Sequence, residues 1–330
     1  SINDIAAVME RVGHTQIPDV FTTRTAVSVL AELRSMGLLF VDSIAIRMST
    51  QCDLHPLIRE YFYKLLLNPK ELHRHVSKII LARIPDPKPA DSESIAKLVE
   101  IIYHNIESGN LHGAWEIYRN HLGGYPYLGY TRGDHPTGSK TVYMFLEHGE
   151  HLYTNKEEDL TEEALFDLYT DGALYLKNEG RLDDAIDLLQ RADSRLSVIQ
   201  TQSDRYASAL LVRSGIEFLR ARFEEALSSI SVAALEFSRV RPLLREVTIA
   251  RVSKELISRR ATVLAALGDR ESKELFEKAT TISEPDSVVP HDYLPIRYGW
   301  YLALIGNTKR AREVLIEGRD RVEHLQAKML

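Results

Sequence analysis

The chain has 330 residues, more than one small core needs, and its length predicts two or three domains. Its 41 Lys and Arg against 47 Asp and Glu give a net charge of -6. That balance argues against a nucleic-acid-binding protein, because such proteins gain affinity by neutralising phosphates. Cys52 is the single cysteine, so we expect no intrachain disulfide or thiolate metal site, and a cytoplasmic protein. The sequence contains no run of about 18 apolar residues, so we expect no membrane span. The first residues do not resemble a signal peptide.

The first 83 residues predict a winged-helix-like domain followed by one more helix. The expected order is helix, helix, two short strands and helix. The second helix ends at Gly37, as helices commonly do at a glycine. The elements after the opening helix are expected at residues 25–36, 38–41, 44–48 and 56–67, with the additional helix at 69–83. The first 80 residues hold nine Lys and Arg against eight Asp and Glu, so we expect a regulatory module rather than a DNA reader.

A histidine and a proline stand where the strands lead into the next helix. His55 and Pro56 lie within residues 52–62, and proline suits the first position of a helix. This segment resembles the winged-helix end of STAND-type signalling NTPases, the class that includes the NB-ARC proteins. The resemblance implies that His55 contacts the phosphates of ADP and helps to hold the inactive state. The plant-type motif has Asp after the histidine, so only the role of the histidine carries over. The alternative is a histidine at a helix start whose ring bonds to nearby backbone groups.

A proline-rich segment separates this region from the rest of the chain. Pro85, Pro87 and Pro89 alternate within residues 84–92, and three such prolines favour an extended, stiff spacer. We therefore place a linker at 84–92 and a helical-repeat sensor domain at 93–330.

An internal repeat predicts the architecture of the second part. Short segments that begin with a glycine or alanine and end in alanine recur at residues 109–114, 180–185, 221–226 and 306–311, with a degenerate copy at 268–270. The positions that follow each segment keep one register: Leu189 and Ala192, Ile230 and Ala233, Phe276 and Ala279, Leu315 and Gly318. Small residues also recur before them, at Ala173, Gly215, Ala261 and Gly299. The pattern resembles tetratricopeptide repeats, whose small residues let paired helices approach closely, and it predicts a mainly α fold with an α-solenoid.

The interval from His121 to Lys140 interrupts this pattern and is expected to be a loop rich in glycine and tyrosine. A comparable insert occurs in bacterial STAND sensor regions. Its tyrosines could form an adaptable binding surface; we favour the alternative, that they pack the junction of two array segments. Residues 133–141 resemble a phosphate-binding loop only superficially, because Ser139 separates Lys140 from Gly138.

The inner wall of a solenoid is usually lined by the first helix of each pair and binds partners. The repeat register places seven residues near that wall: Asp167, Lys177, Asn178, Arg220, Arg259, Arg297 and Trp300. Arginine and tryptophan often anchor interfaces, so this set suits an acidic ligand or one that accepts aromatic contacts. The alternative is that these arginines are simply solvated.

No catalytic motif accompanies these residues, so we expect neither an enzyme nor a metal site in this chain. His73 and His75 are two residues apart on an expected helix and point to different faces, which rules them out as a chelating pair.

Together the features predict the winged-helix and repeat-sensor part of a STAND NTPase. The family resemblance implies an upstream nucleotide-binding domain that binds ADP or ATP, and a protein or peptide ligand on the concave surface of the repeats. Two alternatives stay open: a tetratricopeptide adaptor without a nucleotide switch, and a winged-helix transcription regulator. The alternatives differ most in the role of His55, which a nucleotide switch requires and an adaptor does not.

Overall fold

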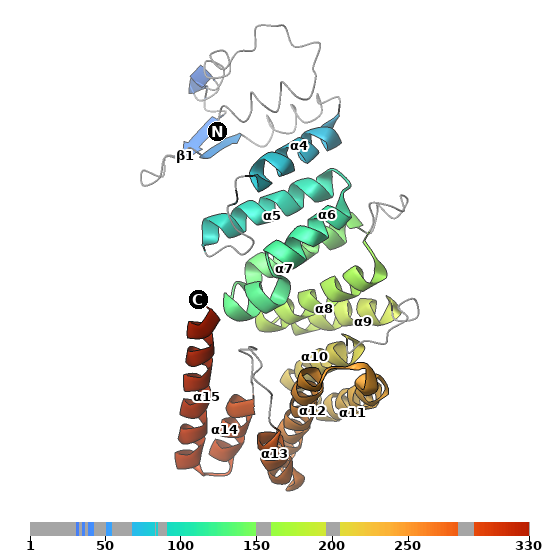
Figure 1. The fold of residues 1–330 in the computed structure, drawn as a ribbon, viewed down its shortest axis with the longest axis vertical. Coiled ribbons are helices and arrows are strands. Elements are labelled where there is room, and N and C mark those ends of the chain that lie inside the picture. Colours follow the sequence, from blue (N-terminus) through green and yellow to red (C-terminus); the bar gives the residue numbers. More distant parts are fainter. Residues whose placement is uncertain are drawn as a thin grey trace. The chain divides into compact units, whose positions relative to one another are not determined.

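The computed structural model describes residues 31–32, 35–36, 39–42, 51–54, 68–82, 84, 91–149, 160–195, 205–282 and 294–329 (Figure 1). The described part of the chain is mainly α. It divides into two compact units, residues 1–124 with 143–160 and residues 125–142 with 161–330. None of the described helices combines the length and the apolarity that a membrane span requires.

The described part of the first unit includes two short strands. β1 (Leu39–Asp42) pairs antiparallel with β2 (Gln51–Leu54), so that Leu39 stands opposite Leu54. β1 confirms the strand predicted at 38–41 to within a residue, and the helical residues 31, 32 and 35 agree with the helix predicted at 25–36. The second predicted strand at 44–48, the helix from Pro56 and His55 itself lie outside the described residues. The winged helix therefore stays a prediction.

The helices of the first unit begin with side-chain caps. In α4 (Pro69–Leu81) the Asn68 side chain accepts a hydrogen bond from the Glu71 N–H, and in α5 (Ser92–Glu107) Asp91 accepts one from the Ser94 N–H. α6 (Leu111–Glu116) follows and continues into a π-helical turn at Ile117–His121. α4 packs against α5, which lies beyond the predicted linker. The helix that follows the expected winged helix thus shares packing with the first helix of the predicted repeat domain.

The described residues of the second unit form four helix pairs, each made of neighbours in sequence (Figure 1). They are α8 (Glu162–Asn178) with α9 (Leu182–Arg195), α10 (Arg205–Leu219) with α11 (Phe223–Val240), α12 (Glu246–Ala266) with α13 (Glu271–Thr281), and α14 (Leu294–Leu304) with α15 (Thr308–Met329). The first helices also contact one another in order, α8 with α10, α10 with α12 and α12 with α14. This is the helix pairing of a tetratricopeptide-type repeat, and it confirms the predicted mainly α repeat fold.

The turns between paired helices use a left-handed backbone position. Gly180, Gly268 and Gly306 have φ values of 80°, 76° and 83°. Glycine adopts this conformation without a steric penalty, which explains why it recurs in the repeat. Ala221 takes the same place in the α10–α11 turn with φ 58°, where its Cβ makes the conformation less favourable.

The small and apolar residues of the predicted register form the core of the helix pairs. Nearly all of them are buried: Ala173, Leu189, Ala192, Ile230, Ala233, Ala261, Phe276 and Ala279. Gly215 and Gly318 are half-buried, and Leu315 is the most exposed member, with 43% of its surface exposed. It lies over Gly299, where an added Cβ would come within 2.7 Å of the Leu315 Cγ. The close approach of α14 and α15 therefore depends on this glycine.

The loop predicted from His121 to Lys140 is wrong over most of its length. Residues Tyr125–Thr131 form a π-helical segment, and α7 (His135–Gly149) begins soon after it. The Asp134 carboxylate accepts a hydrogen bond from the Thr137 N–H and so satisfies one donor at the start of α7. Sequence composition suggested a loop because glycine is rare inside helices, but here glycines make room for aromatic rings.

Tyr125 shows how those rings pack. It is buried and has edge contacts with Tyr130 and Tyr175, while Gly138 leaves space for the Tyr175 ring beneath α7. The Tyr125 side chain therefore belongs to the core of the second unit, which favours the packing interpretation over a binding surface. Gly138 lies inside a helix, so residues 133–141 do not have the shape of a phosphate-binding loop.

Candidate partner-binding site

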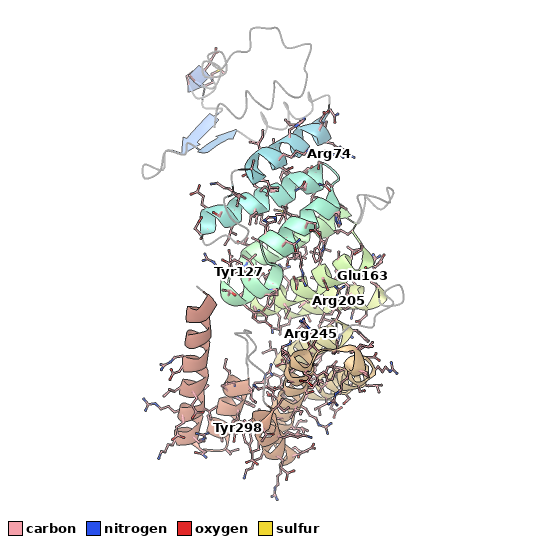
Figure 2. The ribbon with its side chains drawn as sticks, viewed as in Figure 1. Arg74, Tyr127, Glu163, Arg205, Arg245 and Tyr298 are labelled. Carbon is pink, nitrogen blue, oxygen red and sulfur yellow. The ribbon has the colours of Figure 1, made fainter. Side chains whose placement is uncertain are left out.

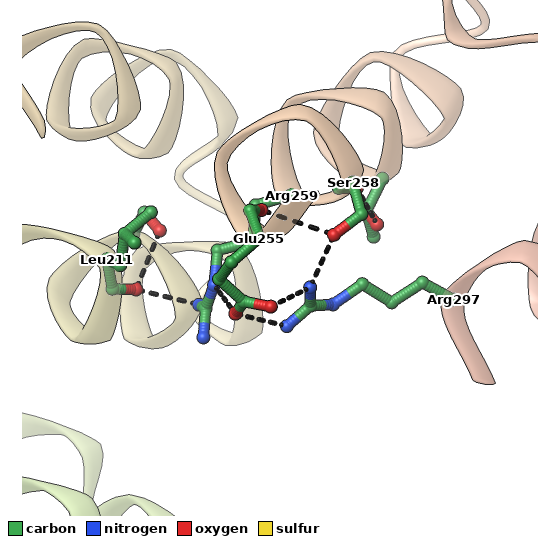
Figure 3. A network of polar contacts seen from close by, with 7 residues as sticks. Leu211, Glu255, Ser258, Arg259 and Arg297 are labelled. Atoms are coloured by element: carbon green, nitrogen blue, oxygen red, sulfur yellow. Dashed lines mark hydrogen bonds and ion pairs between the residues drawn. The ribbon is translucent and has the colours of Figure 1, made fainter. Parts of the chain in front are cut away.

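A network of charged side chains joins α10, α12 and α14 around the Glu255 carboxylate (Figure 3). Arg297 donates two hydrogen bonds to Glu255, from Nη1 to Oε2 and from Nη2 to Oε1, each 2.8 Å long. Arg259 donates from Nε to Oε1 of the same carboxylate at 2.5 Å. The Arg259 Nη1 also donates to the Leu211 carbonyl of α10, and the Arg297 Nη1 donates to the Ser258 Oγ. Each guanidinium thus donates hydrogen bonds to at least two other residues, which fixes its plane.

The charges around Glu255 determine its ionisation. Burial alone would raise the pKa of its carboxyl group, but Arg297 and Arg259 outweigh that effect and hold the pKa well below its ordinary value. The carboxylate therefore stays ionised at neutral pH. Because both arginines are charged as well, the trio carries one net positive charge.

Lys177, near the end of α8, adds a further positive charge. Burial, followed by the nearby charges of Arg259 and Arg297, lowers the pKa of Lys177 to about 8 against the opposing effect of Glu255. The ammonium group makes no hydrogen bond or ion pair with any residue that the structure describes. The charge of Glu255 therefore acts on all three cations, Lys177, Arg259 and Arg297.

An aromatic pair lies beside these charges. Trp300 is one turn along α14 from Arg297, and 40% of its surface is exposed. Its ring meets Phe218 of α10 edge-on, with the centroids 6.3 Å apart. Phe218 is in turn one turn along α10 from Gly215, where an added Cβ would lie 2.5 Å from the Arg259 Nη1. The charged group and the aromatic pair therefore occupy the same faces of α10 and α14.

The other three predicted residues form separate contacts. Asp167 is 3.7 Å from Arg205, which is labelled at the start of α10 in Figure 2. Arg220 forms an ion pair with Asp183 of α9 at 2.7 Å. Asn178 donates a hydrogen bond to the Tyr125 hydroxyl. Each of these three residues links neighbouring elements of the fold. The structure brings together the other four of the seven predicted residues: Lys177, Arg259, Arg297 and Trp300.

Glu255 and Phe218 were missed at the sequence level. Glu255 stands four residues before Arg259, a spacing that places the two side chains together on a helix and could have indicated the pair. Nothing in the sequence indicates that Arg297, 42 residues away, meets the same carboxylate.

A histidine pair in the first unit was also missed. The Nδ1 atoms of His73 in α4 and His104 in α5 are 2.6 Å apart and share a hydrogen bond. Burial, followed by the nearness of His104, lowers the pKa of His73 to about 4, so its ring is neutral at pH 7. Among the described residues no group of three or more possible ligands could hold a metal ion. The pair thus links α4 with α5.

An apolar hollow of about 400 Å³ lies on α14 and α15, and none of its lining residues belongs to the charged network. It is lined by Ala303, Ala311, Leu315 and Ile316, together with Thr308, Arg312 and Arg319. It offers few polar groups to orient a ligand, whereas ligand sites usually combine apolar walls with placed polar groups. The network around Glu255 is therefore the better candidate.

The helix pairs define the class of the molecule: it is a mainly α helical-repeat protein with tetratricopeptide-type pairing. The chain matches no protein-family model and no curated protein. Among solved structures it is similar to BtubC (BKLC) from P. vanneervenii, with 17% identity and a TM-score of 0.45. The alignment covers 76% of this chain and 92% of the BtubC chain.

Proposed function

We propose that the second unit binds a segment of another protein on the surface formed by α8, α10, α12 and α14. The observation that supports this most is the convergence of Arg259, Arg297 and Lys177 beside a half-exposed tryptophan. Tryptophan and arginine are the side chains that most often dominate binding energy in protein interfaces. The first helices of repeat arrays commonly provide such surfaces.

A peptide selection with the whole chain tests this function. Peptides from a random library that bind the wild-type chain should lose at least tenfold in affinity for the Trp300→Ala variant, because a central aromatic anchor is worth about 2 kcal/mol or more. Leu235→Ala is the matched control, since Leu235 is exposed on α11, a second helix. The proposal fails if the wild type selects no peptides, or if Trp300→Ala binds them as well as the control does.

A wider role as the sensor part of a STAND NTPase remains a proposal that rests on the residues around His55. The supporting structural detail is β2 (Gln51–Leu54), a strand immediately before His55 in the sequence. The test is to purify the full-length gene product with its expected upstream domain and to extract its bound nucleotide. ADP should be retained by the wild type and exchange faster in His55→Ala. Retention that is indifferent to His55 would instead favour an adaptor without a nucleotide switch.

A further inference from the structure

We propose that Lys177, Arg259 and Arg297 hold an anionic oxygen group, a carboxylate or a phosphate, on the bound protein segment. The inference rests on the proposed function and names the chemical group that the same site recognises. The ligand would be a segment in which an acidic or phosphorylated residue lies close to an apolar side chain.

The first argument is the charge balance. Among the described residues, Glu255 is the acid that acts on Lys177, and its two oxygens already accept three hydrogen bonds from Arg297 and Arg259. Lys177 therefore has no counter-charge bonded to it among the described residues, while the charges of two arginines act on it. Burying like charges together is costly unless a counter-charge joins them, so the site is electrostatically incomplete without an anion.

The second argument is that donors remain for such an anion. The Lys177 ammonium makes no hydrogen bond with the described residues. Arg259 uses its Nε and Nη1 for Glu255 and for the Leu211 carbonyl, and its Nη2 donates to no described residue. An ammonium and a guanidinium edge are the usual donors to carboxylate and phosphate oxygens.

The third argument is preorganisation. Arg259 is fixed by Glu255 and Leu211, and Arg297 by Glu255 and Ser258, so little side-chain freedom is left to lose on binding. Gly215 lies directly against the Arg259 guanidinium, where any larger residue would displace it. Since rigid donors lose less entropy on binding, this arrangement suits recognition better than a solvated surface arginine does.

The fourth argument is the neighbour on α14. Arg297 and Trp300 are three residues apart and share one helix face, and Trp300 is exposed enough to meet a ligand. An anionic group held by the cations would place the adjacent residue of the segment over the Trp300–Phe218 pair. The site thereby predicts both a charge and an apolar neighbour in its ligand.

Protection of Lys177 from acylation tests the anion site without any peptide. The whole chain is treated with acetic anhydride at pH 7.5 in rising inorganic phosphate at constant ionic strength, and each lysine is measured by mass spectrometry. Phosphate should slow acetylation of Lys177 saturably and at least fivefold. Lys273, an exposed lysine of α13, should not change. Arg259→Lys keeps the charge but loses the planar donor fork, and it should weaken the protection. Equal acetylation rates of Lys177 with and without phosphate would overturn the proposal of an anion site.

Peptide variants distinguish the two sources of the anion. Peptides from the selection are compared with Glu, phosphoserine or Gln at one position, on the wild type and on Lys177→Met. At least one anionic form should bind tenfold or more tighter than Gln, and Lys177→Met should reduce that ratio to about two. Peptides that bind without charge preference overturn the anion site but keep the proposed function. If phosphate protects Lys177 but the chain binds no peptide, the anion does not come from a protein segment, and that part of the proposal is overturned.

Discussion

Replacing Glu255 with Gln should lower the free energy of unfolding by about 2 to 3 kcal/mol at pH 7. The substitution keeps the size of the side chain but removes the charge that holds Arg259 and Arg297. Removing one partner of a buried ion pair costs about 3 to 5 kcal/mol, because the remaining charges are left uncompensated. We take a lower value, since 26% of the Glu255 side chain is exposed. Denaturant unfolding of both proteins measures the difference.

The pH dependence of this stability has a defined sign. The pKa of Glu255 is lower in the folded chain than in the unfolded chain, so its contribution is present above about pH 4.3 and is lost as the pH falls. Glu255→Gln should therefore lose less stability than the wild type between pH 6 and pH 3. Glu277→Gln is the control, because that carboxylate is exposed and 4.0 Å from Lys273; it should cost less than about 0.5 kcal/mol. Equal effects of the two substitutions would contradict the role given to Glu255.

The helix pairs could be predicted from the sequence because their determinants are local. The glycines at 180, 268 and 306 occupy left-handed turn positions, and the alanines that follow are buried where the helices cross. Such features repeat within a few residues, so comparison of one segment with the next reveals them. The same comparison could have predicted the left-handed conformation of Ala221, because Ala221 aligns with these glycines.

The loop and the site were predicted less well because they depend on distant contacts. Residues 121–140 look like a loop by composition, but Gly129 and Gly138 accept the rings of Tyr125 and Tyr175 and so remain helical. The repeat register correctly placed Lys177, Arg259 and Arg297 on first helices. It could not show that they meet at Glu255, since that convergence is set by how α8, α12 and α14 pack.

Replacing Lys177 with Met should raise the free energy of unfolding of the free chain by about 1 to 2 kcal/mol at pH 7. The pKa of Lys177 is about 8 in the folded chain and about 10.4 in an unfolded chain. At pH 7 the folded chain thus holds a charge that its surroundings disfavour, and each pKa unit corresponds to about 1.4 kcal/mol. We discount the full shift, because Lys177 keeps contact with solvent. Methionine keeps the length of the stem and removes the charge.

The stability gain should disappear as the pH rises. Between pH 8 and pH 10.4 the unfolded wild-type chain binds more protons than the folded chain, so its stability increases with pH, while that of Lys177→Met does not. The two curves should approach each other near pH 10, and Lys273→Met should stay close to the wild type throughout. A loss of stability in Lys177→Met at pH 7 would show that the lysine supports the fold. A gain, together with loss of anion binding, would show that the chain keeps a destabilising charge because its ligand requires it.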